Sequence, residues 1–289
     1  MKSRPRRSAL YMPGSNARAV DKARTLPADT LILDLEDAVA PGRKPEARQQ
    51  VRDAIAMGGY GRRELLVRAN PLDTPWGADD LRAFADAGAD GIVLPKVASP
   101  ADVLQAVQIL EASGAPDSLA LWIMAETASC ILHIDAIAGA HPRLAGILLG
   151  TSDLARELRV RHTADRLGFI ATLNLCVLAA RAHGLDVLDG VHLDLEDDAG
   201  LRRACEQGRD LGFDGKTLIH PRQLEAANAV FAPAADELDR AREIIVAWRE
   251  ASARGSALVV IGGKLVENLH VAEAERLLAV AAAVAEMGW

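Results

Sequence analysis

Short apolar runs alternate with longer amphipathic segments along most of this 289-residue chain. Within the runs, apolar and polar side chains do not alternate, which is typical of parallel strands that are buried on both faces. We expect strands at residues 8–12, 30–35, 64–68, 91–95, 119–125, 146–150, 186–191 and 215–219. A strand followed by a helix, about eight times with short connections, predicts a parallel sheet covered by helices.

The amphipathic segments between these runs repeat apolar positions at helical spacing. We expect helices at residues 16–26, 44–57, 78–87, 100–113, 129–138, 164–183 and 198–211. Strand–helix units repeated over roughly 220 residues fit a closed (β/α)8 barrel better than an open doubly wound sheet. The stretch MPGSNAR after the first strand also lacks the G-x-G-x-x-G spacing that a dinucleotide-binding open sheet would carry.

The last part of the chain shows a different pattern. A long helical stretch at 222–253 leads to the glycine-bracketed segment GSALVVIGGKLVEN and a final helix at 271–286. These elements lie outside the strand–helix repeats. We therefore expect a barrel domain over residues 1–221 and a C-terminal helical extension over residues 222–289.

Composition and charge exclude several classes of protein. The net charge of −7 gives no general reason to bind nucleic acid, which usually needs a basic face. No apolar run approaches the roughly 18 residues of a membrane span, and none follows the basic start MKSRPRR as a signal peptide requires. The three cysteines are widely spaced and odd in number, which is typical of core residues in a reducing compartment. We therefore expect a soluble, cytoplasmic protein that binds neither nucleic acid nor membrane.

Polar side chains gather where the predicted strands end, which is where barrels of this kind carry their chemistry. In chain order they are Asp34, Glu36, Asp37, Arg68, Lys96, Glu126, Asp153, Lys216 and His220. Taken singly, each has a structural explanation. Asp37 and Asp153 could cap helices. Arg68 and Lys96 could form ion pairs at the barrel rim, and His220 could satisfy a turn.

Glu126 and Asp153 follow consecutive predicted strands, so their carboxylates are expected at the same end of the barrel. Two carboxylates, with the remaining positions left to water, suit a hard cation such as Mg²⁺. Such a site keeps positions open for the carboxylate and keto oxygens of a 2-keto acid, and Arg68 could stabilise an enolate beside it. No H-x-x-x-H pair indicates zinc, and no G-x-S-x-G motif indicates a serine nucleophile.

Several stretches taken together resemble one known family, the citrate lyase β-subunit-like enzymes of the HpcH/HpaI aldolase superfamily. They are RSALYMPGSNARAVDKA, ILDLEDAVAPGRKPEAR, LLVRANPLDTPWGADDL, GIVLPKV, MAETASCI, GILLGTSDLAREL and DGKTLIHPRQ. Their order and spacing cover most of the predicted barrel. The resemblance implies a (β/α)8 fold and the cleavage or formation of carbon–carbon bonds in 3-hydroxyacyl-CoA thioesters.

The resemblance also assigns roles to single residues. It implies that Glu126 and Asp153 bind Mg²⁺, that Glu126 also contacts substrate, and that Arg68 is a catalytic and substrate-binding residue. It further implies that a layer of side chains surrounds these ligands. In this layer Glu36 and Asp37 hold metal-bound water. The members of this layer are Glu36, Asp37 and Lys96.

The tail departs from the family pattern. Family members commonly carry a G-K-M-[IV]-D segment whose Asp reaches the active site of a neighbouring subunit, whereas this chain has GGKLVEN, with Glu267 at that position. The extra methylene moves the carboxylate by about a bond length or more, which leaves thioester hydrolysis and the acyl preference open. We expect a homotrimer, or a multiple of one, in which Glu267 of one chain takes part in proton transfer at the next. The alternative is a tail that packs on its own barrel, with Glu267 solvated.

The leading hypothesis is a Mg²⁺-dependent lyase that cleaves or forms a 3-hydroxyacyl-CoA, such as malyl-CoA or citramalyl-CoA, with acetyl-CoA and a 2-keto acid. The alternatives are a metal-dependent aldolase on free 2-keto-3-deoxy acids, a citrate lyase β subunit within a larger complex, and a non-catalytic barrel that keeps a ligand pocket. Basic residues near the N-terminus favour CoA, because its phosphates need cations. They are Arg4, Arg6, Arg7, Arg18 and Lys22.

Overall fold

The computed structural model describes residues 4–254 and 258–289. Strands β1 to β8 are parallel and form a closed barrel in chain order, with β1 pairing β8 to complete the ring. This confirms the predicted (β/α)8 barrel. The strands are β1 Ser8–Pro13, β2 Thr30–Asp34, β3 Glu64–Arg68, β4 Gly91–Leu94, β5 Ala120–Ala125, β6 Leu144–Leu149, β7 Asp186–Asp189 and β8 Gly215–Leu218.

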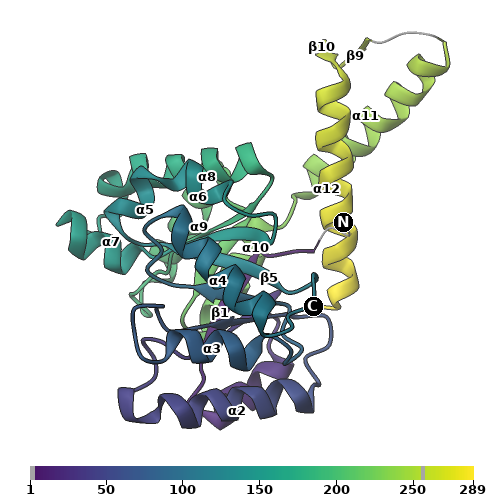
Figure 1. Cartoon of the computed structure of the whole chain (residues 1–289). Coiled ribbons are helices and arrows are strands. Elements are labelled where there is room, and N and C mark those ends of the chain that lie inside the picture. Colours follow the sequence, from purple (N-terminus) through teal and green to yellow (C-terminus); the bar gives the residue numbers. More distant parts are fainter. Residues whose placement is uncertain (1–3, 255–257) are drawn as a thin grey trace. The chain divides into compact units, whose positions relative to one another are not determined.

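Helices follow the strands and surround the barrel (Figure 1). Short 3₁₀ turns accompany some of them: η1 Ala23–Thr25, η2 Pro41–Arg43, η3 Leu167–Phe169 and η4 Pro221–Gln223. The helices of the barrel are α1 Ala17–Lys22, α2 Lys44–Met57, α3 Gly77–Phe84, α4 Pro100–Ala112, α5 Ala128–Leu132, α6 Ile134–Ala138, α7 Thr151–Leu158, α8 Ile170–His183, α9 Asp198–Leu211 and α10 Leu224–Phe231.

Two of the predicted helices are interrupted. The predicted helix over 129–138 divides at His133 into α5 and α6. The predicted helix over 222–253 is wrong as a single element, because Pro233 lies in the break between α10 and α11 Ala235–Ala253. Proline lacks the backbone N–H that a continuous helix needs, and it disfavours helical geometry in the residue before it.

Side chains from the strands fill the barrel interior, which is therefore a packed core. They are Ala9, Ile32, Leu66, Val93, Trp122, Met124, Leu148 and Leu188. Trp122 is the largest of these, and it faces Gly146 on β6. A Cβ at Gly146 would lie 2.1 Å from the indole ring, so only glycine leaves room for the tryptophan.

Arg6 closes the N-terminal end of the barrel. Its guanidinium lies 5.0 Å over the Trp122 ring and donates to both oxygens of Glu64, at 2.6 and 2.7 Å. It also pairs with Asp186. Arg7 is buried beside it in an ion pair with Asp29. The suggestion from the sequence that Arg6 and Arg7 could bind a CoA phosphate is therefore wrong, because buried acids at the strand starts already engage both cations.

The chain divides into two compact units. One is the barrel, Arg6–Phe231, and the other comprises Ala232–Trp289 together with the first residues of the chain. In the second unit, α11 packs against α12 Asn268–Met287, and the antiparallel strands β9 Val259–Ile261 and β10 Lys264–Val266 form a hairpin between them in sequence (Figure 1). The glycine-bracketed segment is thus a hairpin, although residues 255–257 of it lie outside the described residues.

Across the described ranges, the helices lack the combination of length and apolar character that a crossing of the lipid bilayer requires.

Candidate active site

A cavity of about 370 Å³ opens at the C-terminal ends of the barrel strands. Tyr11 of β1, Arg68 of β3 and Glu126, which directly follows β5, all line it. Parallel strands of a barrel end at the same edge, so side chains far apart in the sequence meet there. The sequence-predicted residues in the lining are Asp34, Asp37, Arg68, Glu126 and Asp153.

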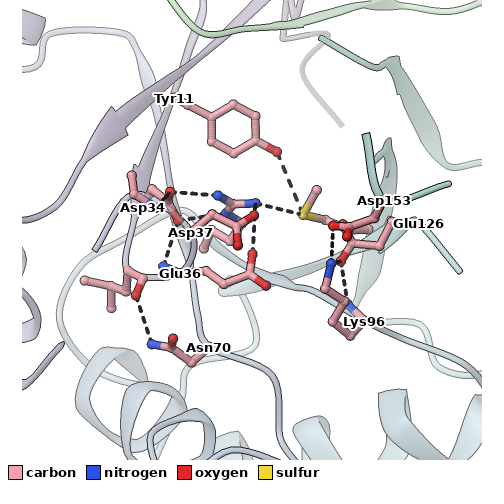
Figure 2. A network of polar contacts seen from close by, with 12 residues as sticks. Tyr11, Asp34, Glu36, Asp37, Asn70, Lys96, Glu126 and Asp153 are labelled. Carbon is pink, nitrogen blue, oxygen red and sulfur yellow. Dashed lines mark hydrogen bonds and ion pairs between the residues drawn. The ribbon is translucent and has the colours of Figure 1, made fainter. Parts of the chain in front are cut away.

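Lys96 lies between the two acids that were expected to bind a metal. Glu126 is 1% exposed, and its Oε1 accepts the backbone N–H of Lys96 at 2.7 Å. The Lys96 ammonium lies 3.4 Å from the same oxygen and also contacts a carboxylate oxygen of Asp153 (Figure 2). Burial raises the pKa of Glu126, and Lys96 opposes that rise. The two carboxylates therefore converge on one cation.

Local backbone geometry produces this arrangement. Lys96 has a φ of 55°, which is uncommon for a residue other than glycine, and both its N–H and its ammonium meet Glu126. On the other side, a Cβ at Gly150 would lie 2.4 Å from the Cβ of Glu126. Glycine at this position is what allows the turn after β6 to pass against the buried acid.

The same turn places Asp153. Gly150 occupies the N-cap position of α7, so Asp153 stands in the first helical turn and is not the cap. Its carboxylate pairs instead with Lys96 and, at 2.9 Å, with the exposed Arg156. The interpretation of Asp153 as a helix cap is therefore wrong.

The geometry around Glu126 and Asp153 fits Mg²⁺. The described part of the chain contains no group of three or more His, Cys, Asp or Glu side chains that could hold a metal ion. A pair of carboxylates that already meet at one cation is, however, the usual protein contribution to a Mg²⁺ site, in which water and substrate supply the remaining oxygens. Glu126 and Asp153 are the residues that would hold the ion.

Arg68, the last residue of β3, also lines the cavity and is 7% exposed. Its Nε and Nη2 each donate to a different oxygen of Asp34, both at 2.7 Å. Its guanidinium also stacks on the ring of Tyr11, with 4.7 Å from Cζ to the ring centroid. The third guanidinium nitrogen, Nη1, does not bind Asp34. It contacts Glu36 at 2.9 Å and the sulfur of Met124 at 3.7 Å.

Asp34 also organises the loop that carries the other two acids. Its Oδ1 accepts the N–H of Glu36 at 2.8 Å, and its Oδ2 accepts the N–H of Ala38 at 3.1 Å. The sequence pattern predicts Asp34 as one of the strand-end acids but assigns it no role. The signal was the register of the sheet, because Asp34 on β2 pairs directly with Arg68 on β3.

The buried acids outnumber the buried bases in this region. Burial raises the pKa of Glu36 to about 8, a rise that Arg68 opposes and that Glu126 and Asp37 increase. The Glu36 carboxylate is only 2.9 Å from Arg68 Nη1, yet its Oε2 makes no hydrogen bond of good geometry among the described residues. A divalent cation bound near these acids would favour their ionised forms. Asp37 is mostly exposed and lies 3.6 Å from Arg68.

The remaining sequence candidates lie elsewhere. Lys216 is buried and pairs with Asp189 at 2.8 Å. His220 is an exposed residue at the start of η4, where it accepts the N–H of Arg222. Glu267 is the N-cap residue of α12 in the second unit, and it is exposed there.

The chain is similar to proteins of known activity. The family model for HpcH/HpaI aldolase/citrate lyase matches residues 7–221. A (3S)-malyl-CoA thioesterase from Cereibacter sphaeroides is 53% identical over 281 residues, which cover 97% of this chain and 96% of that protein. An L-malyl-CoA/beta-methylmalyl-CoA lyase from the same species is 35% identical, with 94% of this chain and 93% of that protein covered.

A solved structure agrees with these relatives. It is protein CitE from Mycobacterium tuberculosis in complex with magnesium, acetoacetate and coenzyme A, which is 29% identical with a TM-score of 0.77. The match covers 98% of this chain and 100% of the chain in that structure. The resemblance seen in the sequence is confirmed. The chain belongs to the HpcH/HpaI aldolase/citrate lyase family, and it is a carbon–carbon lyase of that family.

Proposed function

We propose that this protein cleaves malyl-CoA-type thioesters, in which a carbinol carbon bears a carboxylate and the thioester carbonyl lies two carbons away. The observation that carries the proposal is the pair Glu126 and Asp153, which converge on one cation in the same cavity as Arg68. A cavity of about 370 Å³ accommodates the four-carbon acyl group. The relatives that act on malyl-CoA support the same substrate class.

Each residue then has a defined task. Glu126 and Asp153 would hold Mg²⁺, which supplies Lewis-acid charge to the carboxylate and hydroxyl oxygens of the substrate when bound. Arg68 lines the cavity, and its guanidinium would offset negative charge on the enolate oxygen of the departing acetyl-CoA. Asp34 positions that guanidinium through two hydrogen bonds, so no reorganisation is needed during the reaction.

We also propose that the chain forms a homotrimer or a multiple of one, in which the C-terminal extension packs on a neighbouring subunit. The carboxylate of Glu267 is exposed, as a group that acts in another subunit must be. Large apolar side chains near it are exposed as well, namely Val260, Leu265 and Leu269. Such a surface favours burial against a second copy. Cys130, Cys176 and Cys205 are free, buried thiols, which supports a cytoplasmic location.

A second reaction on the same substrate has its own support. The 53% identical relatives carry the name (3S)-malyl-CoA thioesterase, so hydrolysis to malate and free CoA is the second candidate. The two reactions yield different products from one substrate. Carbon–carbon cleavage yields glyoxylate and acetyl-CoA without a free thiol, whereas hydrolysis yields a free thiol without a keto acid.

The test is to incubate the purified protein with (3S)-malyl-CoA and Mg²⁺, and to measure glyoxylate and free thiol in parallel. Glyoxylate formation that stops on chelation of Mg²⁺ is the expected result. A free 2-keto-3-deoxy acid serves as the comparison substrate for the aldolase alternative. Turnover of that acid, with neither product from malyl-CoA, would overturn the proposal.

A further inference from the structure

Tyr11 is an aromatic residue in the lining of the active-site cavity. Its neighbours Leu10 and Met12 on β1 belong to the outer core, between the strands and the helices. Ala9 belongs to the cluster inside the barrel, and Tyr11 packs against that cluster. Because successive side chains of a strand point to opposite faces, Tyr11 projects from β1 into the barrel, at the end that opens to the cavity.

Two hydrogen-bond donors of this cavity converge on the sulfur of Met124. The Tyr11 hydroxyl lies 3.8 Å from that sulfur, and Nη1 of Arg68 lies 3.7 Å from it (Figure 2). The Tyr11 ring also stacks on the guanidinium of Arg68, at 4.7 Å from Cζ to the ring centroid. Tyr11, Arg68 and Met124 all line the same cavity, so the two donors form one packed unit at its wall.

The sulfur is a poor partner for either donor. A thioether is a weak hydrogen-bond acceptor, whereas the O–H of a buried tyrosine normally finds a full partner. Within the described ranges, this sulfur is the one group to which the Tyr11 hydroxyl donates. A substrate oxygen that enters the cavity beside Met124 would satisfy the hydroxyl better. Methionine is unbranched and flexible, so its thioether can make room for that oxygen.

The Tyr11 hydroxyl is a donor because it keeps its proton. Burial raises the pKa of Tyr11, and Arg68 opposes that rise. Asp34, Glu126 and Glu36 raise the pKa further, because a phenolate would meet negative charge on these sides. A neutral phenol next to a fixed guanidinium is suited to an oxygen on which negative charge develops.

We propose that the Tyr11 hydroxyl, together with the Arg68 guanidinium, binds the enolate oxygen of the departing acetyl-CoA, which makes Tyr11 a catalytic residue. The electron pair of the breaking carbon–carbon bond passes into the acetyl fragment, and its charge collects on the thioester oxygen. The other carbon becomes the aldehyde of glyoxylate. The carbinol hydroxyl gives up its proton and the enolate carbon later takes one up, so the step balances without a co-reactant. The inference rests on the proposed function, because it adds a residue to the same reaction.

Tyr11→Phe keeps the ring on Arg68 and removes only the hydroxyl. A donor that meets the charged oxygen mainly in the transition state acts on turnover more than on substrate binding. We therefore expect kcat for glyoxylate formation from (3S)-malyl-CoA to fall about 100-fold, as for loss of one oxyanion donor, while KM stays within about threefold.

The matched control is Tyr60→Phe, because Tyr60 is the other tyrosine of the chain. Its ring also stacks on an arginine, at 4.8 Å from Arg24, but it lies outside the cavity lining. Its hydroxyl donates to the carbonyl of Val20 at 3.4 Å. This variant is expected to keep kcat and KM, and melting temperatures check that both variants fold.

Binding measurements separate a chemical role from a structural one. In one acetyl-CoA analogue, –CH₂–COO⁻ replaces –S–CO–CH₃ and supplies the charge of the enolate. In a second analogue, –CH₂–CO–CH₃ supplies a neutral carbonyl. Tyr11→Phe is expected to bind the carboxylate analogue about tenfold more weakly, since a hydrogen bond to a charged oxygen is lost. Its affinity for the ketone analogue should stay within about twofold of wild type.

A spectroscopic measurement needs no substitution at Tyr11. In Tyr60→Phe labelled with 3-fluorotyrosine, Tyr11 gives the single fluorine resonance, and the carboxylate analogue should shift it more than the ketone does. Glyoxylate formation by folded Tyr11→Phe within threefold of wild type would overturn the inference and leave the lyase standing. Equal fluorine shifts for the two analogues would overturn it as well. Absence of glyoxylate from the wild type would overturn the proposed function, and the inference with it.

Discussion

The ammonium of Lys96 lies 3.4 Å from Oε1 of Glu126. Because the same ammonium contacts Asp153, a lysine meets both carboxylates at the place where Mg²⁺ is expected. A single ammonium balances the charge of these two carboxylates only in part. The arrangement therefore predicts competition between Lys96 and the metal. A divalent ion that binds these carboxylate oxygens must displace the ammonium or share the oxygens with it.

Lys96→Met tests this competition. We expect the metal-free variant to lose about 1–3 kcal/mol of unfolding free energy, because two acids lose a partner. Added Mg²⁺ should then stabilise the variant more than it stabilises the wild type, since no lysine opposes the ion. Thermal unfolding with and without Mg²⁺ measures both effects. Arg156→Met is the control, because Arg156 contacts Asp153 from the exposed side. An equal Mg²⁺-dependent shift in wild type and Lys96→Met would contradict the prediction.

Removing one of the two acids should separate metal binding from folding. We expect Glu126→Gln and Asp153→Asn to abolish turnover and the stabilisation by Mg²⁺, which is about 2.7 kcal/mol for the wild type at 100 times the Kd. Burial raises the pKa of Glu126, so its ionised form opposes folding at neutral pH. Glu126→Gln should thus keep or increase the stability of the metal-free protein. A normal Mg²⁺-dependent shift in melting temperature in either variant would show that the metal binds elsewhere.

Glu36 should make the metal-free protein less stable as the pH rises. Its pKa is about 8 in the folded chain, against 4.5 for the unperturbed group, because of burial. Between these values the folded state binds more protons than the unfolded state, so the unfolding free energy falls with rising pH. The slope from this one group is at most about 1.4 kcal/mol per pH unit.

Urea unfolding of the metal-free protein at pH 5, 6, 7 and 8 measures that slope. Glu36→Gln should flatten the curve, because the amide does not titrate. Glu46→Gln is the control, because Glu46 is a fully exposed acid on α2. Parallel curves for wild type and Glu36→Gln would mean that Glu36 does not carry the pH dependence.

The sequence predicts the barrel well, because buried parallel strands and amphipathic helices leave a regular hydrophobic pattern. Strand β3 and helix α9, for example, begin and end where the pattern places them. The break between α10 and α11 could have been predicted from the sequence, because Pro233 disfavours a continuous helix there. Glu126 and Asp153 were also accessible, since strand ends in a barrel share one edge.

Other features depend on the register of the strands and on how deeply single side chains are buried. The hydrophobic pattern does not contain this information. Asp34 holds Arg68 only because the two pair across β2 and β3. The sequence places Arg6 in a short basic N-terminal segment, yet its guanidinium packs over the ring of Trp122 at the N-terminal end of the barrel. Tyr11 and Arg68 come from β1 and β3, which are not neighbours in the barrel, and they stack because both side chains point inward. The role of Glu267 stays a prediction.

The last prediction concerns Glu267 and its proposed action in a neighbouring subunit. If each site combines one chain's barrel with the next chain's tail, two inactive variants can complement each other. Asp153→Asn removes a barrel group, and its amide keeps the shape of the side chain. Glu267→Ala removes an exposed tail group. Both changes are expected to leave the fold intact, which melting temperature and size-exclusion chromatography check.

Equal amounts of the two variants are unfolded gently, mixed and reassembled, and each variant alone is treated in the same way as the control. After random mixing, about half of the sites have an intact barrel group, and about half have an intact tail group from the neighbouring chain. About a quarter of the sites therefore have both. We therefore expect about a quarter of wild-type activity from the mixture and none from either control. Mixed oligomers that form, as shown by differently tagged chains, but remain inactive would show that Glu267 does not act in the neighbouring subunit.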